Sequence, residues 1–71
     1  MKKFINIPNK PNDIKEVIYY IPNRKLIGVI SNYFGDLVVM EYEWYGEYWQ
    51  KVANLGQDIM SVKRKYSTTV I

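Results

Sequence analysis

The densest apolar and aromatic run of the chain is Leu37–Trp49, which reads LVVMEYEWYGEYW. Its residues alternate with the period of two that is typical of a β-strand, whose successive side chains point to opposite faces. The segment therefore predicts both a core face and a candidate contact surface. The core face is wholly apolar: Val38, Met40, Tyr42 and Trp44. The other face is acidic and ends in an aromatic ring: Val39, Glu41, Glu43 and Tyr45.

Leu26–Ser31 is apolar without alternation. This pattern is typical of a central strand that is covered on both faces. We expect it to pair with Leu37–Tyr45 through a turn at Asn32–Asp36, where Gly35 and Asp36 favour a chain reversal. Phe4–Ile7 is predicted as a short first strand and Ile59–Val70 as a final strand.

The segment Asp13–Ile21 admits two interpretations. Its apolar residues follow the i, i+3, i+4, i+7 spacing of a helix, and its first acidic residues have the spacing of a capping box. The run VIYYI, however, is rich in residues that favour strands. We favour a short helix here.

The segment Glu47–Leu55 is equally ambiguous. A helical stripe runs through Tyr48, Trp49, Val52 and Leu55, and Gly56 is placed as a C-cap. In the rival interpretation the chain turns at Tyr45-Gly46 and returns as a strand. The helix is slightly favoured.

With two helices the order of elements is β-α-β-β-α-β. This predicts a small α+β domain spanning residues 1–71, with an antiparallel sheet of three to four strands. If both ambiguous segments are strands, the alternative is an all-β meander or a small SH3-like barrel.

The chain contains no cysteine and no histidine among its 71 residues. A disulfide is therefore impossible, the usual zinc ligands are missing, and no metal or cofactor is predicted. Stability must come from apolar packing, and formation of a homodimer is one way to bury more apolar surface. The basic start MKKFINIP is interrupted by polar residues and proline, so we expect no signal peptide, no membrane span and a cytoplasmic protein.

The same absences argue against catalysis. Without histidine or cysteine there is no Ser–His–Asp triad, thiolate nucleophile or imidazole base, and no nucleotide-binding motif occurs. Glu41 and Glu43 lie side by side on one predicted face, which does not flank a substrate as paired catalytic carboxylates do. RNA cleavage by lysine, arginine and tyrosine is the one enzymatic hypothesis left, and it is a minor one. We predict a protein that is not an enzyme.

Charge is distributed unevenly along a chain of net charge +3 and pI about 9.2. Residues 1–35 carry six basic and two acidic side chains, residues 36–58 one basic and five acidic, and residues 59–71 three basic. Tryptophan and tyrosine are common interface anchors, and acidic groups beside them select a basic partner. The predicted protein-binding residues are Glu41, Glu43, Tyr45, Glu47 and Trp49.

This surface predicts a protein–protein interaction module, either a regulator or an inhibitor. The Lys, Asn, Ile and Tyr content favours a low-GC bacterium or its phage as the source. The expected target is then a host nucleic-acid enzyme or defence protein.

The alternative is a small basic nucleic-acid-binding domain. Positive side chains bind phosphates, and tyrosine rings can stack on bases. On the predicted final strand Lys63 and Lys65 share a face, although lysines on an edge strand also serve to block aggregation. The choice depends on whether the acidic or the basic surface is continuous in space. The residues of the basic surface are Arg24, Lys25, Lys63, Arg64, Lys65 and Tyr66.

Overall fold

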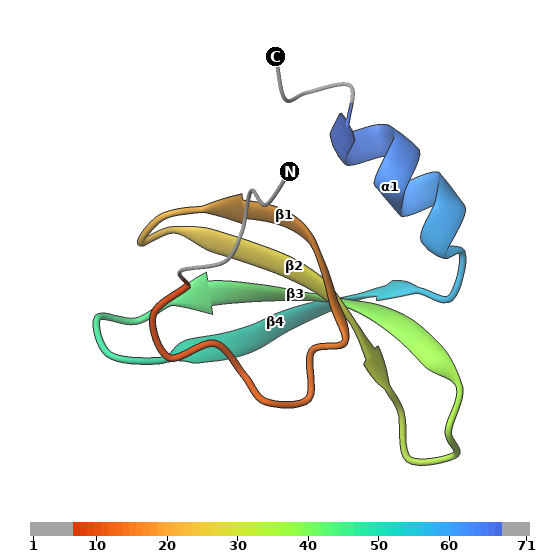
Figure 1. Ribbon diagram of the computed structural model, residues 1–71, viewed down its shortest axis with the longest axis horizontal. Helices are drawn as coiled ribbons and strands as arrows, with labels where there is room; N and C mark the ends of the chain where they lie inside the picture. Colours follow the sequence, from red (N-terminus) through yellow and green to blue (C-terminus); the bar gives the residue numbers. More distant parts are fainter. Residues whose placement is uncertain (1–6, 68–71) are drawn as a thin grey trace.

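Four strands follow one another in a single antiparallel sheet, and one helix follows the last strand (Figure 1). The computed structural model describes residues 7–67. The predicted β-α-β-β-α-β order is therefore wrong: the sheet is an open meander of order β1-β2-β3-β4 with one C-terminal helix. The predicted strand Phe4–Ile7 lies, except for its last residue, outside the described residues. The elements are β1 (Glu16–Ile21), β2 (Lys25–Ser31), β3 (Leu37–Trp44), β4 (Trp49–Gly56) and α1 (Ile59–Ser67).

Strand β2 is covered on both faces, as its unbroken apolar run predicts. Leu26 and Ile30 lie on the face that we call inner, and Ile27 and Val29 lie on the outer face. All four side chains are almost completely buried. The predicted pairing of this strand with β3 is confirmed, and so is the apolar face of β3, since Val38, Met40, Tyr42 and Trp44 all join the inner core.

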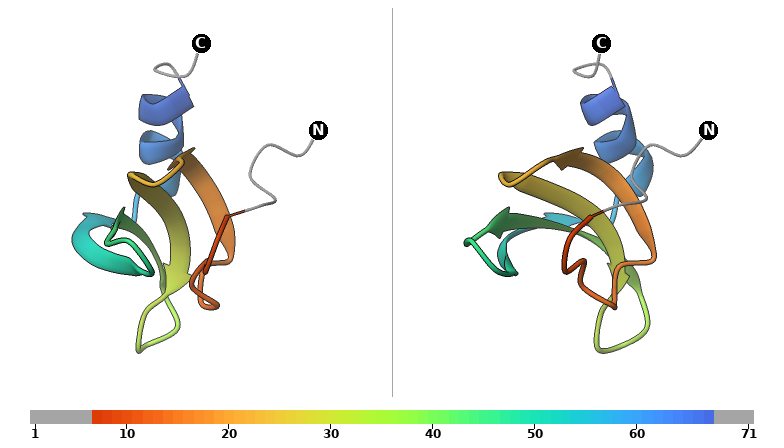
Figure 2. Two further views of the ribbon diagram at one scale, coloured as in Figure 1. Left: turned by 90° about the vertical axis from the view of Figure 1, so that its left-hand side faces the viewer. Right: turned by 60° about the vertical axis from the view of Figure 1, so that its left-hand side comes forward.

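The inner face is covered by residues 7–14, which cross the sheet from the start of β4 to the start of β1 (Figures 1 and 2). Asn9 Nδ2 donates a hydrogen bond of 2.8 Å to the carbonyl of Glu47. Lys51 on β4 forms a 3.5 Å ion pair with Asp13. Ile7 and Ile14 are buried against the sheet at the two ends of this segment. The segment thus connects the two edge strands of the open sheet.

The outer face is covered by α1, in place of the strand predicted over Ile59–Val70. Ile59, Val62 and Tyr66 are spaced three and four residues apart, so they lie on one side of the helix and pack against the outer face. Residues 68–70 of the predicted strand lie outside the described residues. Within residues 7–67, no helix is long and apolar enough to cross a membrane.

Asp58 fixes where α1 begins. Its Oδ1 accepts a 3.2 Å hydrogen bond from the Ser61 backbone N–H, and its Oδ2 accepts a 2.9 Å hydrogen bond from the Ser61 hydroxyl. The backbone hydrogen bond, followed by the side-chain one, lowers the pKa of Asp58 below its usual value. An aspartate in this position satisfies an N–H group that the first helical turn leaves without a partner.

A β-bulge in β1 explains why a helix was wrongly predicted over Asp13–Ile21. Val17 pairs with Gly28 and Tyr19 with Ile27, so Ile18 is an extra residue without a partner in β2. A bulge shifts the alternation of side chains by one position. In a strand that is apolar on both sides, this shift produces spacings that resemble those of a helix.

Two further bulges explain the wrong helix over Glu47–Leu55. Val52 and Leu55 are the extra residues where β4 pairs with β3. The chain reverses at Gly46, whose φ of 89° is the conformation that tight hairpin turns favour and only glycine adopts easily. Trp49 then pairs with Trp44, so the return-strand interpretation is the one observed.

The first prediction concerns Gly28 on the inner face of β2. A methyl group there would lie 2.8 Å from Ile14 Cγ2 and 3.1 Å from the carbonyl oxygen of Glu16. We expect Gly28→Ala to lower the free energy of unfolding by about 1–3 kcal/mol, because Ile14 must move. Chemical denaturation measures this. In a double-mutant cycle, Ile14→Ala should cost less beside Gly28→Ala than alone, and strict additivity would contradict the contact.

The second prediction concerns Tyr42, which is 1% exposed and whose hydroxyl lacks a hydrogen-bond partner among the described residues. We expect Tyr42→Phe to leave the free energy of unfolding unchanged or to raise it by up to about 1 kcal/mol, because a buried polar group without a partner is unfavourable. A loss of more than about 1 kcal/mol would show that the hydroxyl has a partner.

The burial of Tyr42 also predicts that the folded protein loses stability at alkaline pH. Burial, and to a smaller extent Asp13, raises the pKa of Tyr42 from 10.0 to about 12. The folded protein holds this proton more tightly than the unfolded chain, so stability is complete below pH 10 and falls as pH rises toward 12. The Phe variant should be spared this loss of up to about 2 kcal/mol. Equal slopes of stability against pH in the two proteins would contradict the shift.

Candidate protein-binding surface

The outer face of the sheet is polar at the end of β3 that lies farthest from α1. Val39 packs beneath the helix, whereas Glu41 and Glu43 follow on the same side of the strand at the hairpin end. Across the sheet, Glu41 pairs with Ala53 and Glu43 with Gln50. Beyond the strand ends, two tyrosines continue this row. The resulting surface, called here the β3–β4 polar face, comprises Glu41, Glu43, Tyr45, Tyr48 and Gln50.

The two tyrosines of the β3–β4 polar face form a stacked pair. The rings of Tyr45 and Tyr48 are 5.7 Å apart at an interplanar angle of 23°, and each is about half exposed. The Tyr45 backbone N–H donates a 2.9 Å hydrogen bond to the carbonyl of Tyr48, which closes the turn between them. The Tyr48 hydroxyl also lies 3.5 Å from Gln50 Oε1. A flat, amphipathic ring pair is thus held on a short hairpin.

The two carboxylates of the β3–β4 polar face differ in their accessibility. Glu41 is mostly buried and forms a 3.2 Å ion pair with Lys25 on β2. Its hydrogen bond raises the pKa of Lys25 above the usual value, against the smaller opposing effect of burial, and Glu43 contributes further. Glu43 itself is exposed. The negative charge that a partner can reach on this face is therefore centred on Glu43.

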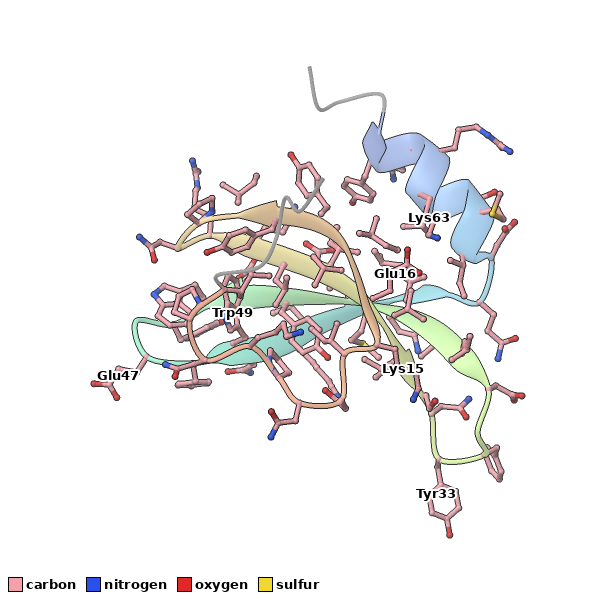
Figure 3. The ribbon with its side chains drawn as sticks, in the orientation of Figure 1. Lys15, Glu16, Tyr33, Glu47, Trp49 and Lys63 are labelled. Atoms are coloured by element: carbon pink, nitrogen blue, oxygen red, sulfur yellow. The ribbon has the colours of Figure 1, made fainter. Side chains whose placement is uncertain are left out.

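Glu47 and Trp49 are the other two predicted protein-binding residues. They differ from each other in their exposure to solvent. Glu47 is exposed at the β3–β4 turn and its side chain points away from the body of the molecule (Figure 3). Trp49 is only 7% exposed. Its ring lies 5.0 Å from that of Trp44 and 6.1 Å from that of Tyr20, and its Nε1 donates a 2.9 Å hydrogen bond to the carbonyl of Pro8. Trp49 is a core residue, and its assignment to the binding surface is wrong.

The predicted basic surface is divided among several elements. Lys63 forms a 2.8 Å ion pair with Glu16 on β1 (Figure 3), and Lys25 is paired with Glu41. Lys63 and Lys65 were expected to share a strand face, but successive side chains of a helix point in directions about 100° apart. Lys63 is therefore directed to the sheet while Arg64 and Lys65 are exposed in the last turn.

The remaining residues of the basic surface are also separated. Arg24 is exposed in the turn between β1 and β2. Tyr66 is half-buried, with its ring 4.9 Å from that of Tyr19 on β1 and 5.7 Å from Lys65 Nζ. Tyr66 therefore helps to attach α1 to the sheet. The predicted basic residues thus lie on β2, on α1 and in the β1–β2 turn.

The predicted site residues do not include a second exposed feature, which lies at the β2–β3 turn. Tyr33 is 94% exposed and Phe34 83% exposed, and the turn projects from the body of the molecule (Figures 1 and 3). We call residues 32–36 the aromatic turn. Its sequence signal is two adjacent aromatic residues inside a turn of Asn, Gly and Asp, where apolar side chains have no core to join.

Within residues 7–67, no group of three or more acidic side chains is placed to hold a metal ion. No protein family, no curated protein and no solved structure matches this chain. The functional proposals below therefore rest on the residues of this chain alone.

The third prediction tests the structural role of Trp49. We expect Trp49→Phe to lower the free energy of unfolding by about 1–3 kcal/mol, because it removes the indole N–H that donates to Pro8 and leaves that carbonyl without its donor. The control Trp44→Phe should cost less, since that ring is only half-buried. Equal losses in the two variants, measured by chemical denaturation, would show that the hydrogen bond to Pro8 contributes little.

Proposed function

We propose that this chain is a non-enzymatic binding protein, which acts in the cytoplasm by contacting a basic surface of a protein partner through the β3–β4 polar face. One observation carries the proposal: Glu41 and Glu43 lie on the outer face of β3 beyond the part that α1 covers, and the stacked tyrosine pair lies in the turn that follows. Exposed tyrosines supply contact area, and exposed carboxylates favour a positively charged partner.

The electrostatics of this surface fit such a role. Glu41 is held in place by Lys25, so it helps to fix the surface, while Glu43 and Glu47 are exposed to a partner. Pairs of this kind at a partly exposed surface contribute about 1 kcal/mol or less to stability. Substitution of the exposed carboxylates should therefore alter binding with little effect on folding.

Enzymes that act on nucleic acids bind phosphates in basic clefts. A cleft of this kind is complementary to the β3–β4 polar face. The proposal is thus a regulator or inhibitor that occupies such a cleft. The alternative of direct nucleic-acid binding has less support, because two of its lysines are ion-paired with carboxylates and its two arginines lie on different elements, Arg24 in the β1–β2 turn and Arg64 on α1.

The fourth prediction tests the β3–β4 polar face together with Glu47, which lies in the turn between these strands. We expect Glu43→Gln/Glu47→Gln to weaken capture of the partner from cells of the source organism by roughly tenfold, which corresponds to about 1.4 kcal/mol. Capture by the wild type should also weaken as salt screens the charges. Pull-down with quantitative mass spectrometry, with and without nuclease, measures this.

The control for the fourth prediction is Asn12→Lys/Gln57→Lys, which adds the same two units of positive charge at exposed positions off this face. It should retain wild-type capture. Equal losses in the two double variants would show that only net charge matters. Loss of capture after nuclease treatment would instead support the nucleic-acid alternative.

A further inference from the structure

The aromatic turn exposes two adjacent aromatic rings to solvent. Tyr33 and Phe34 are 94% and 83% exposed and contact each other edge to face, with ring centroids 5.3 Å apart at 85°. Leu37, at the base of the hairpin, is 43% exposed. Exposed apolar patches of this kind mark interaction sites in soluble proteins.

The aromatic turn is ordered by its own hydrogen bonds. Asn32 Oδ1 accepts hydrogen bonds of 2.9 Å from the backbone N–H groups of Phe34 and Asp36. The Asn32 N–H donates to the Asp36 carbonyl at 2.8 Å, and the Gly35 N–H donates to the Asn32 carbonyl at 3.0 Å. Gly35 has a φ of 91°, which permits this tight reversal. The two rings are thus presented by a preorganised backbone, so little ordering entropy is lost when they are buried.

The charges around the aromatic turn restrict what can cover it. The chain has no lysine or arginine from Leu26 to Gln50, and the turn itself carries the carboxylate of Asp36. Lys15 lies beside β2, where its backbone N–H donates a 2.7 Å hydrogen bond to the Val29 carbonyl. In Figure 3 it is nearer to the turn than Lys63 on α1 is. Asp36 offsets the single charge of Lys15, so phosphates of nucleic acid or of anionic lipid would find no cluster of cations at this tip. Two rings without a basic patch also fall short of stable attachment to a neutral bilayer.

The shape of the aromatic turn also indicates what kind of partner surface can bind it. Figure 3 shows Tyr33 pointing away from the sheet at the end of the β2–β3 hairpin. A convex aromatic tip whose nearby charges balance is complementary to a concave, uncharged apolar pocket. Anchors of this type, a tyrosine or another aromatic ring seated in a pocket, supply most of the binding free energy in many protein complexes.

We propose that the aromatic turn is a second binding site, in which Tyr33 and Phe34 insert into an apolar pocket of a folded protein partner. The site lies at the opposite end of β3 from the β3–β4 polar face. It uses different residues, so either proposal can fail while the other holds.

The fifth prediction tests the aromatic turn by photo-cross-linking. The full chain carries a photoreactive phenylalanine analogue at position 34 and is irradiated in cells of the source organism. We expect cross-links to one protein, with the modified residues mapping to a single apolar pocket. Cross-links to lipid or nucleic acid, scattered cross-links to many proteins, or none at all would overturn the proposal.

The affinity of the cross-linked protein, once purified, provides the quantitative part of the test. Tyr33→Ser and Phe34→Ser should each weaken binding at least about 30-fold, the loss that defines a strong anchor residue. The matched control is Met60→Ser, which removes another exposed apolar side chain, 66% exposed on α1, and should change affinity less than about twofold. Equal effects of all three variants, or unchanged affinity in the turn variants at wild-type thermal stability, would overturn the proposal.

Discussion

Burial of β2 on both faces is the constraint on which the rest of this structure depends. Leu26 and Ile30 point to one side and Ile27 and Val29 to the other, so neither face of the sheet can be left open to water. Residues 7–67 form no second sheet and no large helical layer with which to cover them. It covers one side with the nine-residue helix α1 and the other with the segment 7–14.

Because α1 and the segment 7–14 are small, they determine which surfaces remain exposed to a partner. On the inner face, residues 7–14 reach from β1 to β4 and help to bury Trp49. On the outer face, α1 extends over Val39 but not over Glu43. The exposed large aromatic side chains of residues 7–67 therefore collect at the two hairpins at the ends of β3. These two hairpins carry the two proposed contact surfaces.

The sequence predicted the two central strands and their faces well, because alternation and unbroken apolar runs report directly on burial. It failed at the edge strands, where Ile18, Val52 and Leu55 are bulge residues and are all apolar. An apolar residue added to a strand converts a period of two into spacings of three and four, which is the signature of a helix.

The other errors have separate causes. The signals for α1 were present in the cap at Asp58 and the spacing of Ile59, Val62 and Tyr66, but β-branched and aromatic residues also fit a strand. Of the residues predicted to bind a partner, Glu41 and Glu43 lie on one face of β3, as their alternation indicates. Trp49 could not be placed from sequence, because its burial depends on a carbonyl 41 residues away, that of Pro8.

The most direct test of the central role of β2 is native-state amide hydrogen exchange of the whole chain. If covering both faces of this strand organises the fold, the amides of Ile27 and Val29 should exchange only through global unfolding, with the highest free energies of opening in the protein. The amides of the two turns at the ends of β3 should exchange through local opening. Exchange of the β2 amides at free energies as low as those of the edge strand β4 would contradict this organisation.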